Sequence, residues 1–168
     1  RDRVELERAG LLTGIVTQNV DGLHLAAGSR KVIALHGDME EVVCLDCGAH
    51  HARSLIDALL TQANPDYFNS VEVTGSMINP DGDVELRATD VERFRMIDCP
   101  ACGGQRLKPS VVYFGENVPR GRREAAHQWL DESASVLALG TSLAVMSGYR
   151  FVIDARKQGK PCLLYTSP

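Results

Sequence analysis

The sequence predicts an α/β protein in which a small metal-binding module interrupts a parallel sheet. Short apolar strands alternate with helical segments before residue 40 and again after residue 106, and two CxxC pairs lie between them. Hydrophobic residues make up 44% of the 168 residues and charged residues 24%, as in globular proteins with a substantial core. We therefore expect a Rossmann-like sheet domain at residues 1–39 and 107–168, and a zinc-binding module at residues 40–106.

Hydrophobic periodicity and turn residues predict the individual elements. A helix is expected to end at Gly10, and Cys162 is expected to be a small core residue on a buried strand. Turn signals at residues 79–82 interrupt a weakly patterned stretch, residues 64–95. Strands are predicted at residues 14–17, 31–35, 110–114, 136–139 and 162–165, and helices at residues 20–27, 52–63, 122–132 and 147–158.

Charge and hydropathy argue against two classes of partner. The net charge of −4 gives no reason to expect nucleic acid. No apolar run approaches the roughly 18 residues of a membrane-spanning helix, so no membrane partner is expected. The charged start of the chain does not resemble a signal peptide, and we interpret the cysteines as metal ligands in a reducing compartment.

Two CxxC pairs predict a closed zinc site. Two residues between cysteines allow a tight turn to aim both sulfurs at one point, and a glycine follows each pair. Four thiolates complete a tetrahedron and leave no open position, so the zinc is expected to be structural. The pairs are separated by residues 48–98, more than the roughly 15–20 residues of a common zinc ribbon, which indicates an inserted helix and loop. The four predicted ligands are Cys44, Cys47, Cys99 and Cys102.

Polar residues follow two of the predicted strands, where parallel sheets bind ligands. Asn19 and Asp21 follow the first strand and are able to hold a polar group such as an amide; either could instead cap the next helix. His36 follows the second strand and suits a general base, because its pKa normally lies near working pH. A hydrogen-bonded structural histidine is the alternative for His36.

Two further turns offer polar groups to a ligand. The strand that ends in Val111-Val112-Tyr113-Phe114 enters a turn at Gly115-Glu116. The strand before Gly140 enters the turn Gly140-Thr141-Ser142, whose N–H and hydroxyl groups are of the kind that bind phosphate or ribose. Small polar residues are common in ordinary loops, so this turn alone is weak evidence.

Taken in order, these motifs resemble the sirtuins, the NAD-dependent protein deacylases. The resemblance runs from residue 13 to about residue 165, and the class II branch is the most similar. That branch is indicated by Leu45-Asp46-Cys47-Gly48, by the loop at residues 80–84 and by Ser147-Gly148-Tyr149-Arg150-Phe151. The family motifs matched are Thr17-Gln18-Asn19-Val20-Asp21-Gly22-Leu23-His24, His36-Gly37, both CxxC pairs, Val111–Glu116 and Gly140–Val145.

The resemblance implies a reaction between NAD and an acylated lysine of a protein or peptide. It implies that the acyl oxygen attacks the ribose carbon bearing nicotinamide, and that His36 then takes a proton from a ribose hydroxyl. The implied products are nicotinamide, lysine and an acyl-ADP-ribose. The same resemblance assigns catalysis to His36 and Asn19, cofactor binding to Gln18, Asn19, Asp21, Gly140, Thr141 and Ser142, and peptide binding to Val111, Phe114, Gly115 and Glu116.

Two expectations qualify this assignment. The family's Gly-Ala-Gly-x-Ser loop, which cradles phosphate, is absent from the sequence, and the last residues match poorly. We therefore expect the chain by itself to be inactive and its full-length parent to be the enzyme. ADP-ribosyl transfer to protein and a non-catalytic zinc-ribbon binding module are the alternatives. The protein is expected in the cytoplasm of a bacterium or in the mitochondrial matrix of a eukaryote.

Overall fold

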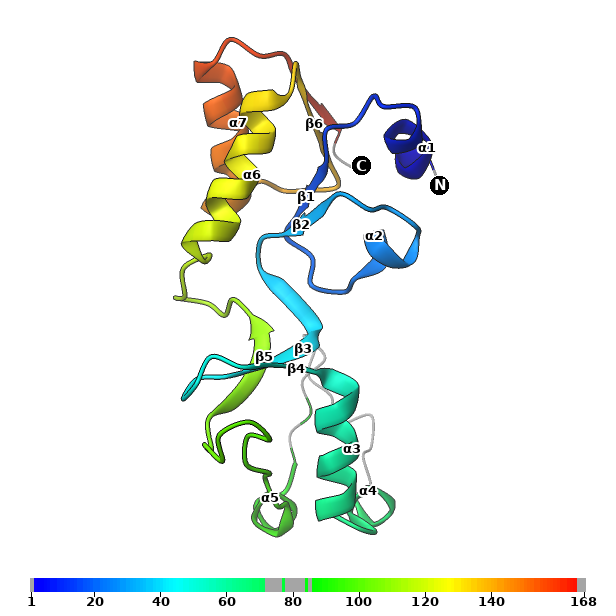
Figure 1. Ribbon diagram of the computed structural model, residues 1–168, viewed down its shortest axis with the longest axis vertical. Coiled ribbons are helices and arrows are strands. Elements are labelled where there is room, and N and C mark those ends of the chain that lie inside the picture. The colour runs from blue at the N-terminus through cyan, green and yellow to red at the C-terminus, as the bar shows by residue number, and fades with distance from the viewer. Residues whose placement is uncertain (1, 72–76, 78–83, 85, 166–168) are drawn as a thin grey trace. The chain divides into compact units, whose positions relative to one another are not determined.

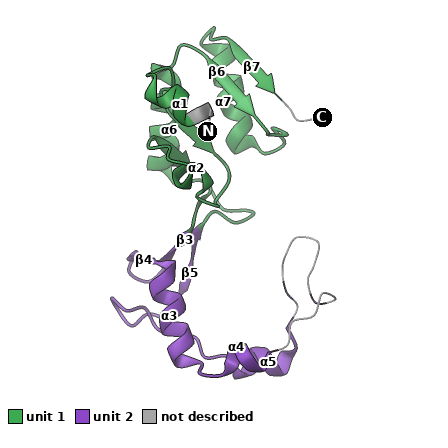
Figure 2. Ribbon diagram, turned by 90° about the vertical axis from the view of Figure 1, so that its right-hand side faces the viewer, with its two compact units in different colours: residues 1–39, 111–168 green, residues 40–110 purple. Residues whose placement is uncertain are grey.

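The computed structural model describes residues 2–71, 77, 84 and 86–165. The chain divides into two compact units, which Figure 2 shows in separate colours. Unit 1 comprises residues 1–39 and 111–168, and unit 2 comprises residues 40–110. The class II loop noted at residues 80–84 lies outside the described residues except for Val84.

Unit 1 alternates helices and short strands (Figure 1). Its parallel strands are joined through helices, the connection that parallel pairing requires. The elements are α1 (Asp2–Arg8), β1 (Ile15–Thr17), α2 (Leu23–Ala26), β2 (Val32–Ala34), α6 (Arg120–Glu132), β6 (Val136–Leu139), α7 (Met146–Lys157) and β7 (Cys162–Tyr165).

The strands of unit 1 form two parallel pairs. β1 pairs with β2, with Thr17 opposite Ala34, and β6 pairs with β7, with Leu139 opposite Tyr165. The predicted parallel α/β class is therefore confirmed. The described strands do not form one continuous sheet, because the two pairs are not hydrogen-bonded to each other.

Helices α6 and α7 pack against each other in unit 1 and run side by side in Figure 1. Ala126 and Leu130 on α6 and Ala155 on α7 are buried. The ring of Trp129 on α6 lies so close to Gly14 that a Cβ at residue 14 would come within 2.4 Å of it. Packing therefore requires glycine at position 14, since the side chain of any larger residue would displace the Trp129 indole.

Several predictions of strand and helix boundaries or burial were wrong. The helix expected at residues 20–27 is only α2, because Gly22 adopts a left-handed conformation with φ 65° and delays the helix start. The strand expected at residues 110–114 is β5 (Leu107–Val111), since the chain turns at Gly115. Cys162 does lie on a strand, but β7 is largely exposed and Cys162 is only half-buried, so the predicted buried strand was also wrong.

Unit 2 is built on a small antiparallel sheet that the sequence analysis did not predict. The sheet contains β3 (Gly37–Cys44), β4 (His50–Ala52) and β5, in the order β4-β3-β5. β3 and β4 pair with Val42 opposite His51. Both β3 and β5 extend slightly across the boundary between the units. Besides these strands, unit 2 contains the helices α3 (Arg53–Ala63), α4 (Tyr67–Ser70) and α5 (Ala88–Arg93).

A few buried contacts join the helices of unit 2. Tyr67 on α4 packs edge-to-face on Phe94, with ring centroids 4.9 Å apart. The buried Asn64 amide exchanges two hydrogen bonds with the backbone of Arg95, at 2.7 and 2.8 Å. The buried Asp90 carboxylate is paired with Arg87 at 2.8 Å. These contacts satisfy the buried polar side chains of Asn64 and Asp90.

Over the described part of the chain, each helix is too short or too polar to pass through a bilayer.

Candidate functional site

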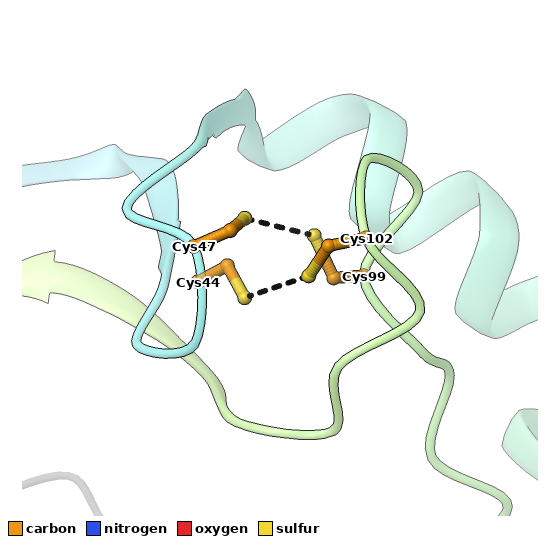
Figure 3. A group of neighbouring side chains, drawn as sticks. All are labelled: Cys44, Cys47, Cys99 and Cys102. Atoms are coloured by element: carbon orange, nitrogen blue, oxygen red, sulfur yellow. Dashed lines mark hydrogen bonds between the residues drawn. The ribbon is translucent and has the colours of Figure 1, made fainter.

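Two loops of unit 2 bring four cysteines together (Figure 3). Cys44 and Cys47 lie on the loop that ends β3, and Cys99 and Cys102 lie on a second loop, far along the chain. Their four Sγ atoms lie within 4.8 Å of one another. Between the loops, Cys44 Sγ is 3.8 Å from Cys102 Sγ, and Cys47 Sγ is 3.9 Å from Cys99 Sγ.

These distances fit a tetrahedral zinc site. Zinc–thiolate bonds of roughly 2.3 Å place the sulfurs of a regular tetrahedron about 3.8 Å apart. The same separations are far longer than the ~2.05 Å of a disulfide, and all four cysteines are free. The predicted zinc ligands are therefore positioned to bind one zinc ion, with no position left for a substrate. When bound, the metal would supply structural stability rather than chemistry.

The backbone of both cysteine loops has the same turn. The N–H of Gly48 donates to the carbonyl of Cys44, and the N–H of Gly103 donates to the carbonyl of Cys99, each at 2.8 Å. Gly48 and Gly103 have φ 74° and 72°, in the left-handed region that favours glycine. This is the role that the sequence analysis predicted for the glycine after each pair.

An ion pair ties one cysteine loop to the other. Arg106 Nε donates to Asp46 Oδ1 at 2.6 Å, and the Arg106 backbone N–H donates to Asp46 Oδ2 at 3.2 Å. The Arg106 hydrogen bonds hold the pKa of the Asp46 carboxyl below its usual range. Gly104 makes room for this contact, since a Cβ there would lie 2.4 Å from Asp46 Oδ2.

The four thiols do not all ionise easily without a cation. Burial raises the pKa of the Cys44 thiol, but backbone N–H groups of Cys47 and Asp46 and neighbouring thiols outweigh it and lower the pKa to about 7. At Cys102 the Gly104 N–H lowers the pKa, yet the other three cysteines and burial raise it to about 12. A divalent cation removes this conflict by neutralising the thiolates.

A histidine that the sequence analysis missed lies beside the cysteines. His51 Nε2 on β4 is 3.4 Å from Cys99 Sγ, within reach of an N–H···S hydrogen bond. Pairing of β4 with β3 places it there, and β4 was not predicted. An imidazole that donates to a metal-bound thiolate would reduce the charge on that sulfur.

The strand ends of unit 1 bring a second group of side chains together. Because Thr17 and Ala34 end a parallel pair, Gln18 and His36 leave the sheet at the same edge. Their side chains meet at Ser147 on α7: Gln18 Nε2 donates to Ser147 Oγ at 3.0 Å, and His36 Nε2 lies 2.8 Å from the same oxygen. All three residues are half-buried.

Asn19 and Asp21 follow β1 and make local hydrogen bonds. The Asn19 backbone N–H donates to Thr17 Oγ1 at 3.1 Å, and the residue is exposed. Asp21 Oδ1 accepts the N–H of Leu23, the first residue of α2, at 3.1 Å. Asp21 thus hydrogen-bonds to the first residue of the helix, much as the capping alternative predicted. The N-cap position itself is occupied by Gly22.

The Gly140-Thr141-Ser142 turn uses its hydroxyl groups locally. Thr141 Oγ1 accepts the N–H of Leu143 at 3.1 Å, and Ser142 Oγ accepts that of Ala144 at 3.4 Å. Gly140 and Leu143 both have positive φ, 58° and 55°. The resulting tight loop joins β6 to α7 and leaves Ser142 exposed.

The predicted peptide-binding residues lie on β5 and the turn after it. Val111 is the last residue of β5, and Phe114 is fully exposed. Glu116 closes the turn, since its Oε2 accepts the N–H of Tyr113 at 3.0 Å and its N–H donates to the Tyr113 carbonyl. Gly115 adopts φ 87° at the tip.

Of the residues predicted from sequence, the structure joins the four cysteines to one another and links Gln18 to His36. Ser147, which links them, was noted only as part of a class II motif. No local signal marked it, because a serine near a helix start normally indicates a cap.

The comparisons with known proteins identify the family. Residues 4–147 match the model of the Sir2 family, so the chain belongs to the Sir2 family. The resemblance to the sirtuins is thereby confirmed.

Curated relatives are similar over nearly the whole chain. NAD-dependent protein deacetylase 1 of Corynebacterium efficiens is 58% identical over 94% of the chain and 56% of its own length. NAD-dependent protein lipoamidase sirtuin-4 of Bos taurus, a mitochondrial protein, is 42% identical over 94% of the chain and 49% of its own length. The chain thus spans about half the length of the curated relatives it matches.

Solved sirtuin structures share the fold. Sir2Af2 bound to a myristoylated histone peptide superposes with a TM-score of 0.63 and 28% identity, over 96% of the chain and 55% of that structure. A Sir2 homologue in complex with NAD gives a TM-score of 0.67 and 26% identity, over 96% of the chain and 50% of that structure. The predicted Rossmann-like α/β fold with a cysteine-bearing insertion is confirmed.

Proposed function

We propose that the full-length protein is an NAD-dependent protein lysine deacylase. Its reaction would convert an acylated lysine, NAD and water into lysine, nicotinamide and an acyl-ADP-ribose. The observation that carries the proposal is the family match, because it includes His36 and the polar residues that follow β1. Relatives named as NAD-dependent deacetylases support the same reaction.

His36 is the proposed general base. Its position after β2 places an imidazole at the carboxyl edge of a parallel strand pair, where α/β proteins bind their ligands. The ring is half-buried and hydrogen-bonded, so it is oriented yet accessible. An imidazole suits proton removal from a ribose hydroxyl near neutral pH, and such catalysis contributes roughly 10²–10⁴-fold in rate.

The residues proposed to contact NAD lie on both parts of unit 1. Gln18 and Asn19 would contact the ribose, and Asp21 would accept a hydrogen bond from the nicotinamide amide. The N–H groups of the Gly140-Thr141-Ser142 turn would serve ribose or phosphate, which its positive-φ backbone supports. Asn19 and Ser142 are exposed and can reach a ligand without rearrangement of the core.

An acylated peptide is the proposed second substrate. Val111, Phe114, Gly115 and Glu116 would receive it as an added strand, a mode that relies on main-chain hydrogen bonds. The exposed Phe114 supports this assignment, because an unburied aromatic ring beside a strand end offers apolar contact area. Solved relatives bound to myristoylated and propionylated peptides support an acyl-lysine substrate.

We also propose distinct roles for the two parts of the chain. Residues 1–39 and 107–168 would form the NAD-binding domain, and residues 40–106 the zinc module. The cysteine cluster of unit 2 supports the second assignment. A bacterial protein of this kind would act in the cytoplasm and a eukaryotic one in the mitochondrial matrix, since the relatives include both bacterial and mitochondrial proteins.

A panel of acyl-lysine peptides tests the proposed function. The full-length protein is incubated with acetyl-, lipoyl- and myristoyl-lysine peptides, and nicotinamide and free lysine are measured with and without NAD. We expect both products in equal amounts, only with NAD, and not with His36→Ala. Transfer of ADP-ribose to protein without deacylated peptide would favour the transferase alternative, and the absence of NAD consumption would favour the non-catalytic one.

A further inference from the structure

We propose that Ser147 is a positioning residue for His36, a role that rests on the proposed function. Its hydroxyl lies between two side chains that come from separate strand ends, Gln18 after β1 and His36 after β2. These contacts join residues 129 and 111 positions apart in the sequence. They are the hydrogen bonds through which α7 reaches the edge that carries the proposed base.

Donor and acceptor capacity limits the directions of these hydrogen bonds. A serine hydroxyl has one hydrogen and two acceptor lone pairs. The Gln18 amide nitrogen only donates, so it occupies a lone pair of Ser147 Oγ. The serine hydrogen is then available to His36 Nε2, 2.8 Å away. The proposal assigns Nε2 as the acceptor of this hydrogen, which leaves the ring proton on Nδ1.

The same hydroxyl can serve His36 after proton transfer. A protonated imidazole donates from both nitrogens, and Ser147 Oγ still has a second lone pair to accept from Nε2. The ribose hydroxyl would first take the place of the serine hydroxyl as the hydrogen-bond donor to Nε2 and would then transfer its proton to that nitrogen. Ser147 Oγ would accept a hydrogen bond from the new N–H as the product leaves. Ser147 thus orients the imidazole before and after the step without itself losing a proton.

Capping of helix α7 does not explain why a serine occupies position 147. Serine near a helix start usually caps it, but Val145 is the N-cap of α7, with no side-chain hydrogen bond. The Ser147 hydroxyl contacts Gln18 and His36 instead.

The next residue, Gly148, supports the same interpretation. Glycine in a helix is unfavourable relative to alanine, and Gly148 does not have the positive φ that would require it. A Cβ at residue 148 would lie 2.8 Å from Gln18 Oε1 and 2.9 Å from its Cδ. Gly148 therefore leaves the space in which Gln18 reaches Ser147.

The test combines kinetics with a spectroscopic measurement on the full-length protein. For Ser147→Ala we expect kcat to fall by about two- to tenfold, the range that corresponds to one lost neutral hydrogen bond, with KM for the acyl peptide little changed. Ser147→Thr, which keeps the hydroxyl, should recover most of the rate. Gly148→Ala should resemble Ser147→Ala, and the exposed Ser135→Ala should have no effect.

Nitrogen NMR of His36 separates positioning from a structural role. In the wild type we expect the ring proton on Nδ1, and in Ser147→Ala a shift toward the Nε2-protonated form. A wild-type ring protonated on Nε2, or an identical spectrum in Ser147→Ala, would overturn the proposal. This readout needs no turnover, so failure of the deacylase assay in the wild type would count against the proposed function and not against the contact itself.

Discussion

The cysteine cluster of unit 2 and the polar edge of unit 1 are both built from residues far apart in sequence, but they differ in how complete they are. The four cysteine sulfurs have the spacing of a tetrahedral metal site, and two of the four cysteines are buried. In unit 1, Gln18, His36 and Ser147 meet, whereas Asn19, Asp21 and Ser142 remain exposed. A closed ligand set suits a structural metal, and an open polar edge suits a site that must admit substrates.

The difference also lies in what supports each site. The cysteine loops are joined by backbone hydrogen bonds, an ion pair and a close approach at Gly104. The polar edge depends on two side-chain hydrogen bonds to one serine. Changes at the cysteines should therefore affect folding, and changes at the polar edge should affect turnover.

The largest effect is expected from Cys44→Ser. Loss of one buried thiolate removes a zinc ligand, and binding of a structural zinc is worth roughly 10–16 kcal/mol in small zinc modules. Zinc per chain should fall from about one to below half, and unit 2 should become sensitive to protease. Metal analysis and limited proteolysis of the full-length protein measure both.

The fifth cysteine provides the matched control for this experiment. Cys162→Ser changes a half-buried thiol on β7, outside the cluster, and should leave zinc content unchanged. Equal zinc loss in both variants, or full zinc retention in Cys44→Ser, would contradict the assigned ligand set.

The second largest effect is expected from His36→Ala, in turnover alone. Loss of a general base should reduce kcat by about two to four decades. Zinc content and the unfolding midpoint should remain those of the wild type, because His36 belongs to unit 1 and the four cysteines belong to unit 2. The exposed His50→Ala is the control and should retain full rate. Near wild-type turnover in His36→Ala would remove this residue from the mechanism.

The sequence predicted the cysteine site better than the polar edge, for a physical reason. A CxxC pair followed by glycine is a local signal, since the turn that aims both sulfurs is contained in five residues. The contact of Gln18 and His36 with Ser147 depends on how α7 packs on the strand ends, which no local pattern encodes. The strand β4 and its His51 were missed for the same reason, because their position follows from pairing with β3.

A smaller effect is expected from filling the two close approaches, one in each unit. Gly104→Ala would drive a Cβ to 2.4 Å from Asp46 Oδ2, and Gly14→Ala would drive one to 2.4 Å from the Trp129 ring. Each should lower the free energy of unfolding by about 1–3 kcal/mol. Gly104→Ala should also speed zinc release to a chelator, whereas Gly14→Ala should not.

Gly121→Ala is the control for both substitutions, because a Cβ at residue 121 on α6 meets nothing within 4 Å. It should leave stability unchanged or slightly raised. Faster zinc release in Gly14→Ala would show that the two units do not respond separately.

The smallest effect is expected from Asp46→Asn, which keeps the shape of the side chain and removes its charge. The Arg106 hydrogen bonds hold the folded pKa of Asp46 below its ordinary value of 3.8. A depressed carboxyl pKa stabilises the folded state above the unfolded pKa, and this contribution is lost as the pH falls through the folded pKa. The difference in unfolding midpoint between wild type and variant should therefore be constant from about pH 8 to about pH 5 and shrink only in more acidic solution.

Because the Asp46–Arg106 pair is exposed on the Arg106 side, added salt should reduce the difference. Arg106→Gln should reproduce it, and the double variant should be no worse than either single one, since both remove the same interaction. A difference that grows as the pH falls from 8 to 5 would mean that Asp46 acts through thiol ionisation at the zinc site rather than through Arg106.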